Sequence, residues 1–200
     1  MPRKRIAFTD QFPYHVMARS NNREWFYISK ENLWEIFKTE LNRLTTHFEA
    51  RIHAFVLMDN HYHLLISASA NFDLGKIMCI LQTSVSRTVN RTTGRINHVF
   101  GGPYRGCSIQ NDIYYLKVFH YVYRNPIEAG LVEKAENYRF STFQQDSGII
   151  TTKSAGGFQE PISDAKLAEW INQPLENSPR SKITSALRKT IFKLSSQRNY

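Results

Sequence analysis

The chain has 200 residues, 42% of them hydrophobic, so it can bury a core of ordinary size and does not have the composition of a disordered segment. Lysine and arginine outnumber aspartate and glutamate by 26 to 17, and the formal net charge of +9 predicts a surface that attracts polyanions, with nucleic acid the first candidate. The two cysteines, Cys79 and Cys107, are far apart and lack C-x-x-C spacing, so the sequence indicates neither a disulfide scaffold nor a cysteine-based zinc site.

The N-terminal part of the chain predicts strands and one amphipathic helix. Strands are expected at residues 14–19, 51–58 and 61–67. Residues 20–23 are turn formers, and Asp59-Asn60 has the composition of a two-residue hairpin turn. From Glu31 to Phe48 the apolar residues recur at three-and-four spacing, which indicates an amphipathic helix.

A second helix is predicted from the apolar positions between Leu74 and Val89. Arg87 and Arg91 lie four apart on another side of it, where they either contact phosphates or form a solvated face. Residues 100–110 are weakly strand-like, and Asn111 or Asp112 caps a third helix that runs to about Arg124. The order β-α-β-β-α-β-α is typical of an α+β, ferredoxin-like split βαβ fold, an antiparallel sheet with helices on one face.

The remaining chain predicts a short helix, a linker and a basic extension. Asn125 has the features of an N-cap and Pro126 those of a first helical residue, so a new helix is expected to end at Gly130. We expect a domain at 1–146, a Gly-, Ser- and Thr-rich linker at 147–160, and a C-terminal helical extension at 161–200. Its amphipathic, basic part, 181–195, is either a phosphate-binding appendage or a solvated tail.

Two histidines stand at the start of the second hairpin strand. Because successive side chains of a strand point to opposite faces, His61 and His63 project to the same side. This is the spacing that two ligands of one metal ion need. The alternative is a pair of hydrogen-bonded structural histidines, since an isolated H-x-H is a weak motif.

Tyr121 is a candidate nucleophile on the third helix. Lys117 lies one turn before it and Asn125 one turn after it, so the three form a polar stripe. A phenol is a poor nucleophile until a cation stabilises its oxyanion or the phosphate that it attacks, and an ion held by the two histidines could do the latter. The alternative is an aromatic packing residue with its hydroxyl at the rim.

Four motifs occur together and in order between residues 5 and 145. They are "YHVMARSNNREWFY" at 14–27, "FVLMDNHYHLLI" at 55–66, "YVYRNPIEAGLV" at 121–132 and "YRFSTF" at 138–143. In this combination the chain resembles the HUH single-tyrosine (IS200-like) transposases, and most closely the REP-associated tyrosine transposase branch. Four motifs at consistent spacing are far more specific than any one of them.

The resemblance implies a metal-dependent endonuclease and strand transferase that acts on single-stranded DNA beside a hairpin, in DNA transposition. His61 and His63 match the metal ligands, Tyr121 the nucleophile and Asn125 the third ligand, although Asn125 could cap a helix instead. The cofactor implied is Mg²⁺ or Mn²⁺. The ligand types alone would suit zinc as well, so this choice rests on the family.

The resemblance also implies DNA contacts and a cellular setting. Arg3, Lys4 and Arg5 stand where relatives touch DNA, and the alternative is a disordered basic start. Arg105 and Lys117 either face the phosphate backbone or are solvated. Relatives are monomers or homodimers. No uncharged stretch approaches the length of a membrane span and no apolar signal region follows the basic start, so we expect a bacterial cytoplasmic protein, associated with the nucleoid and without membrane contact.

Two other activities are compatible with the sequence. The first is a domesticated hairpin-DNA-binding protein that keeps the fold without cleaving. The second is a metal-dependent phosphodiesterase in which water attacks in place of tyrosine.

Overall fold

The structure is a computed structural model, and it describes residues 9–152, 163–175 and 178–194. The strands are β1 (Tyr14–Arg19), β2 (Arg51–Leu57), β3 (His61–Ser67) and β4 (Arg105–Ser108). The α-helices are α1 (Lys30–Phe48), α2 (Leu74–Thr93), α3 (Asp112–Glu128), α4 (Asp164–Asn172) and α5 (Arg180–Ala186). Two short 3₁₀ helices are η1 (Asn21–Arg23) and η2 (Ala135–Asn137).

The four strands form one antiparallel sheet in the order β2-β3-β1-β4, which confirms the expected ferredoxin-like fold. The fourth strand is shorter than the sequence suggested. Phe100 makes only an isolated bridge with Ser20, and regular pairing with β1 begins at Arg105. The isolated bridge and the regular pairing are separated by Gly102, with φ of 152°, and by Pro103, which has no N–H to donate.

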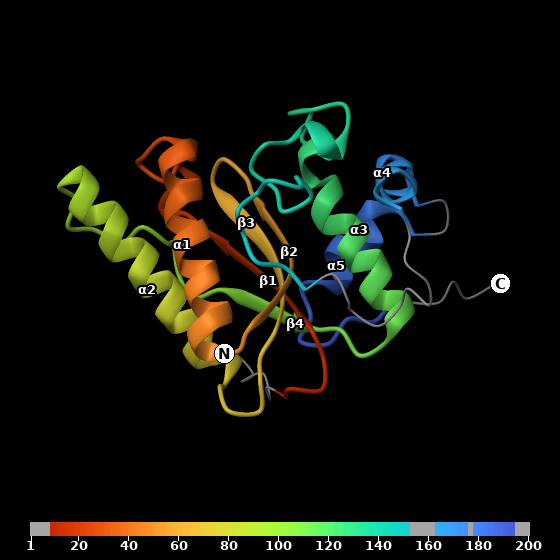
Figure 1. The fold of residues 1–200 in the computed structure, drawn as a ribbon, viewed down its shortest axis with the longest axis horizontal. Helices are drawn as coiled ribbons and strands as arrows, with labels where there is room; N and C mark the ends of the chain where they lie inside the picture. Colours follow the sequence, from red (N-terminus) through yellow and green to blue (C-terminus); the bar gives the residue numbers. More distant parts are fainter. Residues whose placement is uncertain (1–8, 153–162, 176–177, 195–200) are drawn as a thin grey trace.

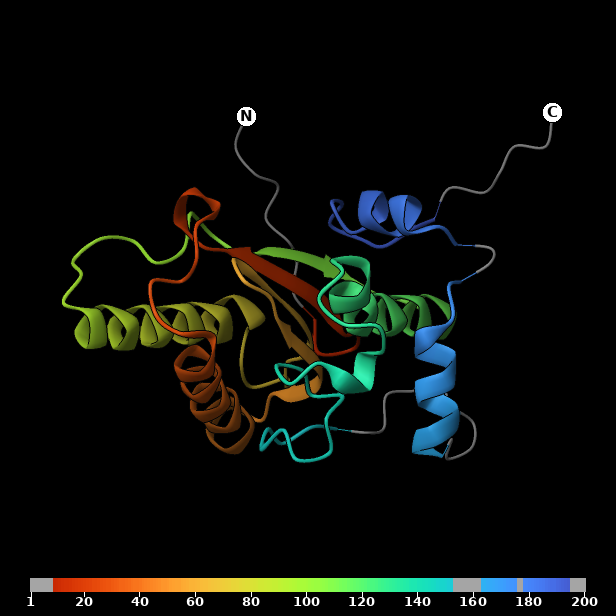
Figure 2. The same cartoon turned by 90° about the horizontal axis from the view of Figure 1, so that it is seen from above.

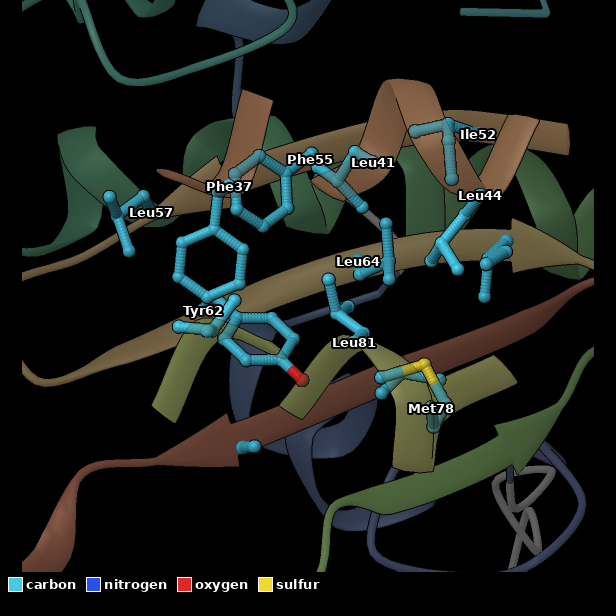
Figure 3. Close-up of a cluster of buried hydrophobic side chains, with 14 of the residues drawn as sticks. Phe37, Leu41, Leu44, Ile52, Phe55, Leu57, Tyr62, Leu64, Met78 and Leu81 are labelled. Atoms are coloured by element: carbon cyan, nitrogen blue, oxygen red, sulfur yellow. The ribbon is translucent and has the colours of Figure 1, made fainter. Parts of the chain in front are cut away.

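One face of the sheet is covered by α1 and α2 (Figure 1). Ser29 caps α1 by accepting from the Asn32 N–H, and Asp73 caps α2 by accepting from two backbone N–H groups. The apolar stripes of these helices pack on alternate residues of β1, β2 and β3. Figure 3 shows the centre of this core, where Phe37, Phe55 and Tyr62 pack ring against ring with centroids 5.1 to 5.9 Å apart.

The opposite face is covered by α3, η2, α4 and α5 (Figures 1 and 2). The expected placement of helices on one face therefore holds for α1 and α2, while the third helix and the C-terminal extension cover the other. The reason is visible in the strands, because β2 is buried at every residue from Ile52 to Leu57, on both faces. A strand that is apolar on both faces needs a layer on each side.

The predicted helix break before Pro126 is wrong: α3 continues through Pro126 to Glu128. Proline has no N–H to donate to the carbonyl of Val122, four residues earlier. The side-chain amide of Asn125 donates to that carbonyl at 3.3 Å and to the carbonyl of Tyr121 at 2.8 Å. Asn125 therefore supports the end of α3 instead of capping a new helix.

The segment after Asp146 is held against the domain as far as it is described. The Ile150 N–H donates to Asn42 Oδ1, the Asn42 amide donates to the Gly148 carbonyl, and the Thr152 N–H donates to the Ile52 carbonyl. The rest of the expected linker, 153–160, lies outside the described residues. None of the helices that the structure describes is both long and apolar enough to cross a membrane.

Candidate active site

The two histidines of β3 lie side by side beneath α3. His61 and His63 both face α3, as strand alternation predicted, and their ring centroids are 5.0 Å apart. The β1 strand beside them pairs Met17 with His63 and Arg19 with His61. The same alternation turns His15 of β1 towards α3 as well, and His53 of β2 meets Tyr115 of α3 edge-on, so four imidazoles line this face.

Each of the two expected ligands is held through its Nδ1 atom. His61 Nδ1 lies 2.8 Å from Asn60 Oδ1, and His63 Nδ1 lies 2.9 Å from His15 Nε2. With a proton on each Nδ1, His61 donates to the amide oxygen and His63 donates to the neighbouring ring, which leaves both Nε2 lone pairs available. Metal-binding histidines are oriented in this way by partners of their second nitrogen.

Burial keeps these rings uncharged at neutral pH. It lowers the pKa of His15 to about 3 and is the main cause that lowers the pKa of His61 to about 4, with the charges of Arg19 and Arg180 acting in the same direction. The pKa of His63 is lowered well below its ordinary value, mainly by burial and then by His15 and His61. Neutral imidazole is the form that binds a metal ion.

Tyr121 comes to this cluster from α3. Its ring stands edge-on to His63, with centroids 5.5 Å apart, and to His15, with centroids 6.0 Å apart. Only 7% of the residue is exposed. Neighbours on the helix, Val118 and Val122, are fully buried and fix α3 on the sheet.

Arg180 reaches the cluster from α5. Its Nη2 donates to Asn125 Oδ1 at 2.7 Å, and its Cζ lies 5.0 Å from the centre of the Tyr121 ring. Asn125 is thus engaged at both ends of its amide, since its Nδ2 donates to the helix backbone. This contact joins α5 to α3 beside the tyrosine.

Removal of the Asn125 amide should destabilise the protein. Asn125→Ala leaves the Val122 carbonyl and the Arg180 guanidinium without their partner, so we expect a loss of about 1 to 3 kcal/mol in the free energy of unfolding, measured by urea titration. Asn125→Asp keeps the acceptor for Arg180 but loses the two donations to the helix, so its loss reports those donations separately. Equal stability of the alanine variant and the wild type would contradict this role.

The other expected DNA-contacting residues are distributed over both faces. Lys117 is half-buried on α3, one turn before Tyr121. Arg105 is exposed on β4. It pairs with Met17 of β1, and Met17 pairs with His63 of β3, so Arg105 and His63 lie on the same face of the sheet, two strands apart. Arg87 and Arg91 are exposed on α2, and the sheet separates them from the histidines. Arg3, Lys4 and Arg5 lie outside the described residues.

Three residues of this site escaped the sequence analysis: His15, Arg19 and Arg180. His15 and Arg19 could have been found from the sequence. A ferredoxin-like strand order places β1 beside β3, and strand alternation then puts His15 and Arg19 on the same face as the histidine pair. Arg180 carried no such signal, since it lies 55 residues beyond Asn125, its hydrogen-bond partner.

The histidine pair supplies two of the donors that a divalent cation needs. Among the described residues no group of three or more His, Cys, Asp or Glu side chains could hold a metal ion. Two imidazoles with available Nε2 atoms and the amide oxygen of Asn125 could hold one if substrate oxygens complete the coordination. In the structure that amide oxygen accepts from Arg180.

The fold and this site together define a ferredoxin-like α+β protein with a histidine pair and a tyrosine facing one another across two layers. The chain belongs to the IS200-like transposase family: the model of that family, described as "Transposase IS200 like", matches residues 8–125, more than half of the chain. The match includes His61, His63, Tyr121 and Asn125, and it ends well before Arg180.

Two solved structures are similar to this one. One is a REP-associated tyrosine transposase bound to a REP hairpin, at 15% identity and a TM-score of 0.58, which covers 82% of this chain and 100% of the other. The second is a candidate transposase from Deinococcus radiodurans, at 15% identity and a TM-score of 0.43, which covers 61% of this chain and 95% of the other. No curated protein matches the chain. At 15% identity, the similarity to the REP-associated tyrosine transposase supports the fold alone.

Proposed function

We propose that the protein is a metal-dependent single-stranded DNA endonuclease and strand transferase, in which Tyr121 forms a 5′-phosphotyrosine link with DNA that carries a REP-type hairpin. The observation that carries the proposal is the packing of the Tyr121 ring against His63, in a member of the IS200-like transposase family. The proposed substrate includes a hairpin because the solved REP-associated tyrosine transposase is bound to one.

In the proposed reaction Tyr121 Oη attacks the phosphorus of a phosphodiester. A bond between that oxygen and phosphorus forms, the bond from phosphorus to the 3′-oxygen breaks, the phenol proton is released, and the 3′-oxygen takes up a proton. Because one phosphodiester replaces another, a free 3′-hydroxyl can reverse the step and join strands without ATP.

The residues around Tyr121 prepare it for this step. His15 and Asn60 orient the two histidines through their Nδ1 atoms. Mg²⁺ or Mn²⁺, bound by His61 and His63 through Nε2 and by the Asn125 oxygen, would stabilise negative charge on the phosphate oxygens as a Lewis acid. In this proposal a monomer carries all these side chains, and Lys117 of α3 and Arg105 of β4 would contact neighbouring phosphates.

The nucleophile is tested by trapping the covalent product. Wild-type protein incubated with a single-stranded hairpin oligonucleotide and Mn²⁺ is expected to give a protein-DNA adduct that survives denaturing electrophoresis, and Tyr121→Phe is expected to give none, because it lacks the attacking oxygen. The matched control is Tyr114→Phe, the same change on the same helix, which should form as much adduct as the wild type.

Each other outcome has a distinct meaning. An adduct formed by Tyr121→Phe would disprove the assignment of the nucleophile. DNA that is nicked without an adduct would show attack by water, and a wild type that binds the hairpin without cleaving it would be a DNA-binding protein that has lost the reaction.

A further inference from the structure

The helix α5 brings positive charge to the candidate site from outside the family match. Arg180 lies over the Tyr121 ring and donates to Asn125, whereas the family model ends at residue 125. The hydrogen bond to Asn125 uses one N–H of Nη2, and a guanidinium has five N–H donors in a planar fork. Donors of Arg180 thus remain for an anion at the tyrosine.

Two hollows flank α5, and cations and hydroxyl groups line both. One of about 400 Å³ is lined by Arg180, Ser181, Thr184, Ser185 and Arg188. A second of about 200 Å³ is lined by Ser181, Lys182, Ser185, Ala186, Lys189 and Lys193. No carboxylate lines either hollow, and all the charged groups and hydroxyls present can donate hydrogen bonds to phosphate oxygens.

The cations of this segment are not paired with acids in the part of the chain that the structure describes. The ion pairs found there join other residues, namely Lys30–Asp59, Lys38–Glu35, Arg43–Glu40 and Arg124–Glu128. Five like charges between Arg180 and Lys193 repel one another, and a bound polyanion would relieve that repulsion.

The segment is anchored, so these charges have a defined position. Ile183 and Ala186 of α5 are buried against the face that carries α3, and Phe192 packs there too. The backbone after α5 also bonds to the edge of β4: the Ser108 N–H donates to the Thr190 carbonyl at 2.9 Å, and the Phe192 N–H donates to the Ser108 carbonyl at 2.8 Å. A merely solvated basic tail would have no such contacts.

We propose that α5 and the residues that follow it to Lys193 form a binding surface for the phosphates of the single DNA strand, with Arg180 holding the strand at Tyr121. This inference rests on the proposed function. Arg180 is the first residue of α5 and Arg188 lies two residues beyond its last one, so the length of the helix separates the two arginines and they would contact different phosphates. The strand would run from the tyrosine along the hollow that both arginines line.

The salt dependence of DNA binding tests this surface without cleavage. In a Tyr121→Phe background and without metal, the affinity for a fluorescent hairpin oligonucleotide with a single-stranded flank is measured by anisotropy over a range of salt. Arg180→Ala and Arg188→Ala are each expected to weaken binding and to reduce the slope of log K against log salt by about 0.7, the value of one phosphate contact on a single strand. The matched control, Arg51→Ala, removes an exposed arginine at the opposite end of the sheet and should leave the slope unchanged.

A second readout separates Arg180 from Arg188. With Tyr121 intact and DNA saturating, Arg180→Ala should slow adduct formation at least about 10-fold, because the guanidinium positions the phosphate at the nucleophile. Arg180→Lys, which keeps the charge but not the planar fork, should recover the salt slope but only part of this rate. Thermal melting checks that each variant is folded.

The outcomes distinguish this proposal from the proposed function. Salt slopes that stay at the wild-type value in both arginine variants would overturn the phosphate-binding surface, whether or not the wild type forms an adduct. Reduced slopes in a protein that forms no adduct would keep the binding surface and reject the tyrosine chemistry.

Discussion

Replacement of His63 by alanine is expected to reduce the yield of covalent DNA adduct at least about 100-fold, since losing even an outer partner of a metal ligand costs 10- to 100-fold. His63 is at the centre of the site: it contacts His15 through Nδ1, stands next to His61, and meets the Tyr121 ring edge-on. Its alanine variant removes one available Nε2 atom, so binding of Mn²⁺, measured by the electron spin resonance signal of the free ion, should fall as well.

The chain offers a closely matched control for this variant. His53 is on the neighbouring strand β2, is 7% exposed against 4% for His63, and has its pKa lowered to about 4, mainly by burial. Its Nε2 lies 2.8 Å from Ser67 Oγ, at the opposite end of β3 from His61, and its ring meets Tyr115 of α3 and not Tyr121. His53→Ala should lose comparable stability and keep both Mn²⁺ binding and adduct formation. If the two variants lost adduct equally, the effect of His63→Ala would be one of folding and not of metal binding.

The part of the site that the sequence predicted rests on local geometry. His61 and His63 face one side because a strand alternates, and the turn at Asp59-Asn60 placed them at the start of a strand. The proximity of Tyr121 could not be obtained in this way. It depends on α3 crossing the face of the sheet opposite α1 and α2, and that choice is made by residues of β2 that are buried on both faces.

Tertiary contacts overrode local rules at Asn125. Asparagine before proline favours a helix start by propensity, yet here the amide replaces the missing proline donor and its oxygen meets Arg180. Residues 163–172 carried an unused signal: Ser163 caps α4 by accepting from the Lys166 N–H, and Leu167, Trp170 and Ile171 recur at helical spacing. Nothing in the local sequence indicated that α5 would contact the site.

Acid should destabilise the folded protein already at pH values above those at which carboxylates titrate. Burial is the main cause that lowers the pKa of His15 to about 3, and of His53 and His61 to about 4, and the pKa of His63 is lowered as well. In the unfolded chain each histidine has a pKa near 6.5. As the pH falls below that value the unfolded state takes up protons that the folded state does not, so the free energy of unfolding must fall with pH.

Its size follows from the number of protons. Each proton bound only by the unfolded state contributes about 1.4 kcal/mol per pH unit, so four such histidines give a slope on the order of 3 to 5 kcal/mol per unit between about pH 6 and pH 4.5. Set against the 5 to 15 kcal/mol typical of a whole domain, this loss is a large part of the stability. Urea titrations at several pH values measure this slope. His53 lies outside the active site, and His53→Gln should lower the slope by the contribution of one proton, about 1.4 kcal/mol per pH unit. A free energy of unfolding that stayed constant over this range would mean that the buried rings are protonated in the folded protein, and it would remove the neutral imidazoles that metal binding requires.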